Sequence, residues 1–420
     1  MTDAPAGPML AADGTPLRVS LRRALRAQKL RALMLVAPLL IFVLMSFLLP
    51  IGDMLFRSVE NDIVPNTLPK TVVELADWDP GQEELPGEAA YAALRDDLTV
   101  AVEEKTQSRL GQRLNYEYSG MSSLLRGVGR DLRDIDPALP AKEQFIEADR
   151  KWGDPRVWQT IKLYSGNLTS GYLLNAVDMR LSPEGVVSEP EGNQIYVKLF
   201  IRTFLMSLGI TFACLLLGYP IAFLLASLPL RTSNLLMILV LLPFWTSLLV
   251  RTAAWKVLLQ QQGVINDLLV WLGIIDTGNR LVMINNATGT IITMTHILLP
   301  FMILPLFSVM KGIKPTYVRA AKSLGANDWT AFWRVYFPQS VPGVGAGSIL
   351  VFILSIGYYI TPELVGGTSG VFISNRIAYH ISTSLNWGLA AALATLLLIV
   401  VLLLYWTYDK IVGIDNVKLG

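Results

Sequence analysis

Long apolar segments are the feature that most limits what this chain can fold into. Six of them, each about 20 residues long, lie near 32–56, 199–226, 235–259, 289–310, 343–360 and 389–408. A helix of that length spans a bilayer and satisfies its backbone polar groups internally. Only 16% of the residues are charged, and the mean hydropathy is +0.46. These properties predict an all-α polytopic membrane protein with about six transmembrane helices, in which the shorter apolar stretches 263–275 and 371–384 form interfacial or re-entrant segments.

Charge and composition exclude several classes of function. The formal net charge is +2, which is too small to indicate nucleic acid as a partner. The single cysteine, Cys214, lies inside an apolar run, so a disulfide framework is excluded. His296 and His380 are the only histidines, and without a cysteine cluster they predict no structural metal site.

The positive charges predict the orientation of the chain. Basic residues precede the first apolar segment: Arg18, Arg22, Arg23, Arg26, Lys29 and Arg31. A second basic group follows the fourth segment, and both positions are cytoplasmic if the first segment is a retained helix rather than a cleaved signal. We therefore expect cytoplasmic tails at 1–31 and 411–420. Arg251 and Lys256 lie in the third segment, near its outer end, where long side chains can reach the interface.

A long hydrophilic stretch separates the first two apolar segments. Residues 57–195 hold a clear excess of Asp and Glu over Lys and Arg. Apolar residues recur at helical spacing over 88–114 and 121–135, and again after Pro140. These patterns predict a mainly helical soluble insert on the periplasmic side, between the first transmembrane helix at 32–56 and a transmembrane core at 196–410.

The loop at 311–338 contains the most informative local pattern. Pro315 suits the first turn of a helix and Gly325 suits its end. Asn327 or Asp328 can then cap a second helix, which we expect to end at Pro338 and to lie against the inner membrane face. Ala320 and Ala321 add a small-residue surface that allows another backbone to approach closely.

This loop resembles the cytoplasmic signature of binding-protein-dependent ABC importer permeases. That signature reads Glu-Ala-Ala, three residues, Gly, nine residues and Ile-x-Leu-Pro, and here the same spacing joins Arg319-Ala320-Ala321, Gly325 and Val335-Tyr336-Phe337-Pro338. The resemblance implies a type I importer fold and a short helix that couples to a separate ATPase subunit. It assigns the coupling contact to Arg319, Ala320, Ala321, Gly325, Asp328 and Pro338. Arg319 replaces the usual acid, so the salt bridge of the family is not carried over to this position, and a carboxylate on the ATPase is the alternative partner for Arg319.

Other segments are similar to polyamine-type permeases, the spermidine/putrescine importers. They include 242–256 with Gly263–Asn266, Thr361–Gly367, Asn386–Gly388 and Tyr219-Pro220, and together they cover the core from about 196 onward. The acidic insert lies outside this resemblance. The implied partners are ABC ATPase subunits that bind ATP and Mg²⁺, a second permease, a periplasmic substrate-binding protein and the lipid bilayer. The chain itself is expected to hold no cofactor and no catalytic residue.

A path for a polycation needs carboxylates and aromatic faces. Glu363 is the candidate acid, and the candidate rings are Tyr358, Tyr359, Phe244, Trp245 and Trp387. The alternative for each ring is an ordinary interfacial belt, and for Glu363 it is a solvated loop, since Pro362 and Gly366-Gly367 flank it. For His296, an interhelical hydrogen bond is the alternative to a transport role.

Two other functions fit a polytopic chain. A secondary transporter driven by an ion gradient usually has paired broken helices and intramembrane acids, which the sequence does not show. A membrane-anchored sensor would not need about six helices. The sequence also has no Gly-rich nucleotide-binding loop with Lys-Ser/Thr, so ATP hydrolysis is expected on another chain. The insert is expected to dock the binding protein or to shield the opening.

Overall fold

The computed structural model describes residues 17–81 and 84–412, which form two units divided between Phe56 and Arg57. Residues 1–16 and 413–420, which belong to the predicted tails, lie outside the described residues. The first unit is one long helical segment: α1 (Leu17–Val43), a π-helical turn (Leu44–Leu48) and α2, which extends to Arg57 (Leu49–Arg57). Its span Gln28–Arg57 has a mean hydropathy of 2.8 and is unburied within the chain, as a lipid-facing helix requires.

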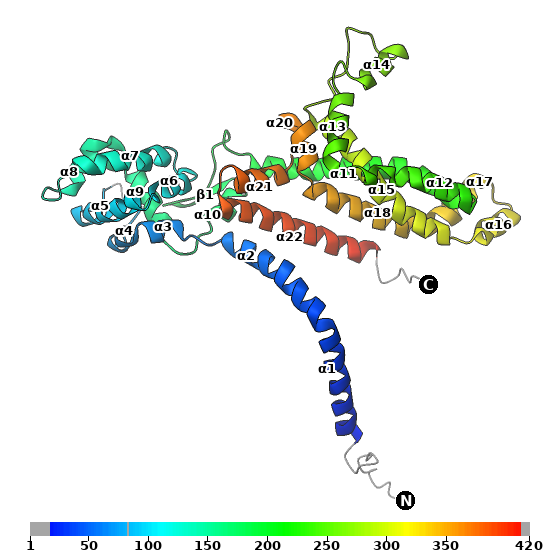
Figure 1. Ribbon diagram of the computed structural model, residues 1–420, viewed down its shortest axis with the longest axis horizontal. Helices are drawn as coiled ribbons and strands as arrows, with labels where there is room; N and C mark the ends of the chain where they lie inside the picture. The colour runs from blue at the N-terminus through cyan, green and yellow to red at the C-terminus, as the bar shows by residue number, and fades with distance from the viewer. Residues whose placement is uncertain (1–16, 82–83, 413–420) are drawn as a thin grey trace, which may run out of the picture. The chain divides into compact units, whose positions relative to one another are not determined.

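The insert at the start of the second unit is a set of short helices around one core. Its elements are α3 (Ile63–Thr67), α4 (Pro69–Glu74), α5 (Glu88–Glu103), α6 (Gln107–Asn115), α7 (Met121–Asp134), α8 (Ala141–Ala148), η2 (Arg150–Gly153), α9 (Pro155–Leu163) and α10 (Gly171–Asn175) (Figure 1). The helical spacing predicted over 88–114 is divided into two helices, because Lys105 adopts a φ of 61° between them. Trp152 and Trp158 are fully buried in this core, which confirms the mainly helical insert.

A small hairpin links the insert to the first long helix of the core. Strands β1 (Met179–Ser182) and β2 (Gly185–Ser188) pair antiparallel, with Met179 opposite Ser188. Gly185, at a φ of 122°, closes the turn in a conformation that favours glycine. This hairpin was not predicted from the sequence. Asp178 follows α10 and accepts hydrogen bonds from the backbone N–H groups of Ile195, Tyr196 and Val197, so the hairpin is anchored where α11 begins.

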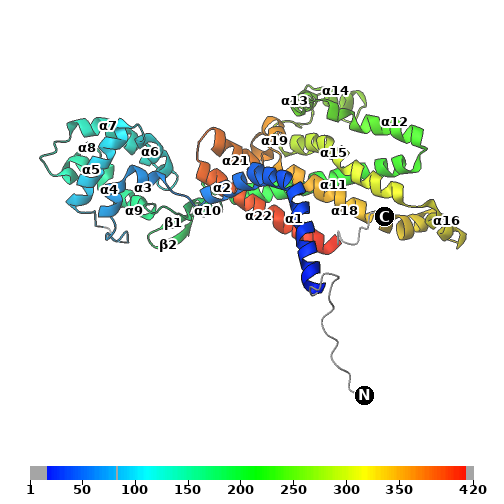
Figure 2. The ribbon, with the colours of Figure 1, turned by 60° about the horizontal axis from the view of Figure 1, so that its bottom comes forward.

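Four long helices form the core of the membrane region: α11 (Tyr196–Ser227), α15 (Ala287–Gly312), α18 (Phe337–Gly357) and α22 (Trp387–Val412). They run alongside one another in both views (Figure 1, Figure 2). Helix α15 is the most enclosed, with 56% of its apolar window buried. Gly218 of α11 and Gly347 of α18 both approach Met302 of α15, where an added Cβ would lie 3.1 Å and 2.8 Å from the methionine side chain. Small residues therefore set the close helix contacts, as is common in membranes.

The predicted third span is not one straight helix. It consists of α12 (Leu230–Leu241), a 3₁₀ turn η3 (Leu242–Trp245) and α13 (Leu248–Leu258), and its two halves are bent by 95°. Pro243 is the second residue of this turn, and the Ser247 hydroxyl then caps α13 by accepting from the N–H of Val250. The bend corrects the expectation of a continuous helix over 235–259, because an apolar run does not reveal where the backbone ladder is interrupted.

Shorter helices connect the long ones. They are α14 (Val264–Trp271), α16 (Pro315–Ser323), α17 (Asp328–Ala331), the π-helical η4 (Phe332–Tyr336), α19 (Ile360–Val365), α20 (Gly367–Gly370) and α21 (Ile373–Ser382). Within residues 17–81 and 84–412, five helices are long and apolar enough to cross a membrane, and the bent pair makes a sixth if it counts as one span. The predicted polytopic α-helical architecture with about six spans is therefore confirmed.

Candidate functional site

Helix α16 and the turn after it form a well-defined motif at one end of the bundle. Pro315 occupies the first turn of α16, where its missing N–H costs no hydrogen bond. Gly325 has a φ of 92°, and the N–H of Ala326 returns to the carbonyl of Ala321, which ends the helix in the left-handed manner that favours glycine. Asn327 then caps α17 by accepting from the N–H of Thr330. The predicted start and end of this helix are confirmed.

The residues assigned to coupling lie mostly on the surface of this motif. Arg319, Ala320, Gly325, Asp328 and Pro338 are exposed, and Ala321 is half-buried. Lys322 forms an ion pair with Asp328 and so joins α16 to α17. Arg319 has no ion pair among the described residues. It borders a cavity of about 670 Å³ on the bundle side, together with Phe223, Met310, Lys314 and Tyr336, among others.

Large apolar side chains are also exposed around this motif. Tyr317 is 51% exposed, Leu324 90% and Trp329 72%. Leu324 in particular projects from the turn between the two helices, where few side chains of this chain pack against it. A surface of this kind, at the end of a hydrophilic loop, is typical of a contact with another protein.

The second helix of the loop differs from its prediction. It does not end at Pro338 but continues through the π-helical turn η4 into α18, so that Asp328–Gly357 is one uninterrupted helical span of 30 residues. Pro338 is placed in the first turn after η4, where the wider π turn accommodates the missing N–H. The segment is therefore the beginning of the fifth span rather than a separate surface helix.

Aromatic side chains connect this helix to α11. They recur at helical spacing as Trp329, Phe332, Trp333, Tyr336 and Phe337. On the other side of the contact, the Phe223 ring meets Tyr336 at 5.1 Å and Phe332 at 5.7 Å, both edge-on, and Tyr219 meets Phe337 at 5.9 Å. The Tyr219 hydroxyl also hydrogen-bonds Ser340 at 2.8 Å. The aromatic spacing was a signal in the sequence, but it was not used to predict this contact.

Three of the predicted path residues lie together near the opposite end of α18. Glu363 is exposed on α19 and accepts a hydrogen bond of 2.6 Å from Asn375 Nδ2. The same amide donates to the carbonyl of Tyr359 at 2.9 Å, and Ser374 donates to the carbonyl of Tyr358 at 2.6 Å. Asn375 thus fixes the carboxylate beside the tyrosine pair, although no sequence pattern had indicated it.

The other predicted rings are placed elsewhere. Phe244 lies in the η3 turn and packs against Phe301 of α15, with ring centroids 5.0 Å apart. Trp245 follows it and is 87% exposed. Trp387 begins α22 and borders a cavity that is shared with the insert. In the part of the chain that the structure describes, the contacts do not join these three rings into one path.

Helix α13 contributes two further polar groups to the core. Trp255 donates a hydrogen bond of 3.0 Å to His296 Nδ1 on α15, which is the interhelical bond considered for this histidine. Arg251 was expected to extend to the interface, but its Nε and Nη1 atoms are buried and have no acceptor among the described residues. Arg251 lies on α13, the half of the third span that follows the 95° bend.

The fold and the exposed loop motif together define a multi-pass permease, and comparisons with known proteins support that class. Residues 197–412 match the family described as "Binding-protein-dependent transport system inner membrane component". The spermidine/putrescine transport system permease protein PotB of Escherichia coli is 36% identical over 222 residues, which cover 52% of this chain and 80% of PotB. The inner membrane ABC transporter permease protein YdcU of Escherichia coli is 30% identical over 277 residues, which cover 62% of this chain and 87% of YdcU.

The chain therefore belongs to the family of inner-membrane components of binding-protein-dependent transport systems. It is a multi-pass permease subunit of an ABC importer rather than an enzyme, and the secondary-transporter alternative is set aside. Among solved structures, a bacterial alginate ABC transporter in complex with a periplasmic protein bound to alginate pentasaccharide aligns with a TM-score of 0.43 and 17% identity. That alignment covers 54% of this chain and 80% of the other.

Proposed function

We propose that this permease forms half of the translocation path for a small cationic solute of the polyamine type, such as putrescine or spermidine. The observation that carries the proposal is the match to PotB, which is 36% identical over 222 residues and extends over 80% of that protein. A soluble binding protein would deliver the solute to this subunit and to a second permease. Two ATPase chains, which bind ATP and Mg²⁺, would drive the cycle from the cytoplasm, where we place both termini and the α16 loop.

Coupling to the ATPase is assigned to α16. The exposed Leu324 and Tyr317 and the free face around Arg319 suit insertion into a protein groove. Motion of α16 would reach the core because the Lys322–Asp328 ion pair joins it to α17, and α17 continues as one helix into α18. The aromatic contacts of Phe223 and Tyr219 would carry the same motion to α11.

The Glu363 carboxylate is the proposed contact for the cation. Asn375 holds it in place, and its exposed position leaves oxygen lone pairs open to a substrate amine. Glu363→Gln keeps the shape and removes the charge. Because a hydrogen bond to a charged group contributes about 1.5–3 kcal/mol, we expect uptake of labelled putrescine or spermidine to fall about tenfold or more.

The control for this substitution is Glu184→Gln, which removes an exposed acid from the hairpin turn of the insert. Uptake is measured in cells that lack the native permease, with the level of each variant in the membrane checked by immunoblot. If both variants transport equally well, Glu363 is a solvated surface residue and the cation path lies elsewhere.

A specific observation favours a second candidate, an anionic solute. Arg251 is half-buried, and its buried Nε and Nη1 atoms have no acceptor in the described chain. Thr252 beside it hydrogen-bonds Thr361 on α19, the helix that also carries Glu363. Competition discriminates the two candidates. If unlabelled polyamines inhibit uptake and small oxyanions do not, the substrate is cationic, and the reverse pattern establishes the anion.

We also propose that the insert lies on the periplasmic side and contributes to the docking of the binding protein. Its excess of acidic residues and its independent core support a role outside the membrane. Replacing the insert by a short linker should raise the substrate concentration for half-maximal uptake. Unchanged uptake by a correctly inserted deletion variant would show that docking does not need the insert.

A further inference from the structure

A second polar site lies between the insert and the loop that precedes α22. The cavity there encloses about 470 Å³ and is lined by α6, by the segment after Arg57 and by residues 384–388. It is distinct from the Glu363 cluster and from the α16 motif. Helix α10 closes one side, because Tyr172 lies so near Gly388 that a Cβ on the glycine would approach the tyrosine ring to 2.3 Å.

Two residues that line this cavity, Arg113 and Asn386, have buried hydrogen-bond donors without acceptors among the described residues. Arg113 is only 3% exposed and pairs with Glu117 through Nη1 at 2.6 Å, and its guanidinium carbon lies 4.2 Å from the centre of the Tyr172 ring. Its Nε and Nη2 atoms have no hydrogen-bond acceptor among the described residues. Asn386 uses its Oδ1 to cap α22 at the N–H of Leu389, which leaves a buried Nδ2 that finds no acceptor in the part of the chain that the structure describes. Buried donors of this kind are rare in folded proteins, because each unpaired group costs free energy.

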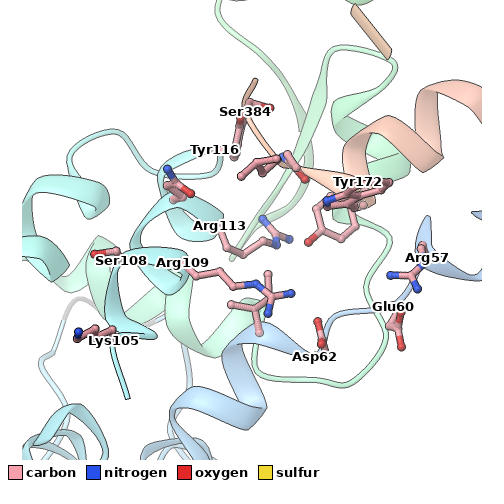
Figure 3. Close-up of a pocket in the computed structure, with 16 residues that line it drawn as sticks. Arg57, Glu60, Asp62, Lys105, Ser108, Arg109, Arg113, Tyr116, Tyr172 and Ser384 are labelled. Atoms are coloured by element: carbon pink, nitrogen blue, oxygen red, sulfur yellow. The ribbon is translucent and has the colours of Figure 1, made fainter. Parts of the chain in front are cut away.

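Exposed cations add to the same wall. Arg109 and Lys105 lie on or beside α6, one and two turns before Arg113, and neither has an ion pair among the described residues. Figure 3 shows the guanidinium groups of Arg109 and Arg113 directed into the cavity from one side, with Arg57 opposite. The first turn of α22 also borders the space, and a helix N-terminus favours negative charge.

We propose that this cavity binds an oxyanion, namely a phosphate or carboxylate group. Guanidinium groups bind such anions through paired N–H donors, and the Asn386 amide would supply a further donor from α22. The volume is sufficient for a small molecule or a headgroup. Glu60 and Asp62 also line the cavity. Their negative charges would repel the anion toward α6 and Asn386, and they would favour a ligand that also carries a hydrogen-bond donor.

The oxyanion would act as a link between the two folds of this unit. Its ligands come from the insert through α6 and from the membrane core through Asn386, so a bound anion stabilises their contact. Two sources have this chemistry: a dissolved anion and the headgroup of an anionic phospholipid. This anion site does not depend on which solute is transported or on how the ATPase binds. The proposal of an anion site is therefore independent of the proposed function.

The test measures thermal unfolding of the full-length chain by intrinsic tryptophan fluorescence. In detergent, potassium phosphate is titrated against potassium chloride at equal ionic strength. In parallel, nanodiscs of phosphatidylglycerol with phosphatidylcholine are compared with phosphatidylcholine alone. A saturable rise with phosphate identifies a dissolved anion, and a rise with phosphatidylglycerol alone identifies the lipid source.

Two variants test the ligands. Asn386→Asp keeps the oxygen that caps α22 but replaces the free donor with a negative charge, and Arg109→Gln removes an exposed cation. Each should raise the apparent dissociation constant at least about tenfold, whereas Arg133→Gln, an exposed residue of α7, should not change it. The proposal is overturned if neither phosphate nor phosphatidylglycerol stabilises the wild type, or if Asn386→Asp and Arg109→Gln respond as the wild type does.

Discussion

The insert buries its large apolar side chains, whereas the membrane core exposes side chains of the same types on its outer surface. In the insert, Trp152 and Trp158 are fully buried, and the Tyr91 hydroxyl donates to the carbonyl of Trp152 at 2.7 Å. In the core, Phe212 is 65% exposed and Trp406 58% exposed on the outside of long helices. Water drives apolar side chains inward in the first case, whereas lipid accepts them on the surface in the second.

Polar groups show the same contrast. Glu117 of the insert accepts hydrogen bonds from Arg113, Tyr164 and Asn175 in a fully buried network. In the core, several hydroxyls bond to their own helix, as Thr211 does to the carbonyl of Ser207, and others bond between helices, as Tyr219 does to Ser340. Glycines such as Gly347 allow close helix crossings. The comparison indicates that the insert depends on buried charge, whereas the core depends on close packing.

The largest expected effect comes from breaking the buried charge network. Glu117→Gln leaves the Arg113 guanidinium buried without a carboxylate, since both side chains are no more than 3% exposed. Breaking a buried pair by removing one charge costs about 3–5 kcal/mol. Hydrogen exchange on the full-length chain should show faster opening of α6, α7 and α9, with little change in α15.

The matched control is Lys70→Ala, which breaks the exposed ion pair with Asp96. Exposed pairs contribute about 0–1 kcal/mol, so exchange in the insert should stay near the wild-type rate. Equal protection in Glu117→Gln and Lys70→Ala would contradict the dependence of the insert on its buried network.

A smaller effect is expected from filling a helix crossing in the core. In Gly347→Ala the new methyl group would lie 2.8 Å from Met302 Sδ and 3.1 Å from its carbonyl oxygen, and such overpacking costs about 1–3 kcal/mol. Gly357→Ala is the control on the same helix, because nothing lies within 4 Å of its added Cβ. Thermal stability in detergent should fall for the first variant only. The packing account fails if the two variants melt together.

The smallest effect concerns pH at the boundary of the two regions. His380 bonds Tyr196 at 3.0 Å and Ser384 at 2.8 Å, its ring lies 6.2 Å from that of Tyr116 of the insert, and Tyr379 also packs against it. Burial, with a contribution from Arg376, lowers the pKa of His380 to about 4. Between pH 6.5 and 4 the unfolded chain binds a proton that the folded chain does not, so the stability from neutral His380 is lost as pH falls.

His380→Gln removes this contribution to the pH dependence. The difference in melting temperature between pH 7 and pH 5 should therefore be smaller in the variant than in the wild type. An equal difference in both proteins would show that His380 is not the group responsible.

The sequence was sufficient to predict the limits of a helix where one physical property determined them. The ends of α11 and α22 lie within a few residues of the predicted apolar runs, because span length follows from hydropathy. Pro315 and Gly325 set the limits of α16 because their backbone preferences are strong. The same approach failed at Pro243 and Pro338, since a proline ends one helix and is accommodated in another according to the turns around it.

The site depended more on tertiary contacts than on local pattern. The α16 motif, to which coupling is proposed, is contiguous in sequence, so its residues were available for prediction. Asn375, which positions Glu363, is an ordinary polar residue in the sequence, and only the packing of α21 against α19 reveals it. Asn386 belongs to a segment that the sequence singled out, but its place at the second cavity follows from the packing of α22 against the insert. The 95° bend between Trp245 and Leu248 likewise was not predicted from the apolar run that contains it.

The measurement that tests the central claim most directly combines copurification and uptake for Gly325→Trp. Gly325 ends α16 at a φ of 92°, so tryptophan both strains the turn and enlarges the surface assigned to the ATPase. The account predicts that tagged wild-type protein, extracted gently from native membranes, brings down an ATPase and a second permease, as identified by mass spectrometry. The variant should insert normally, retain the permease partner, lose the ATPase and abolish uptake. Normal uptake by the variant with the ATPase still bound, or a wild-type chain that is repeatedly isolated alone and folded, would contradict the account.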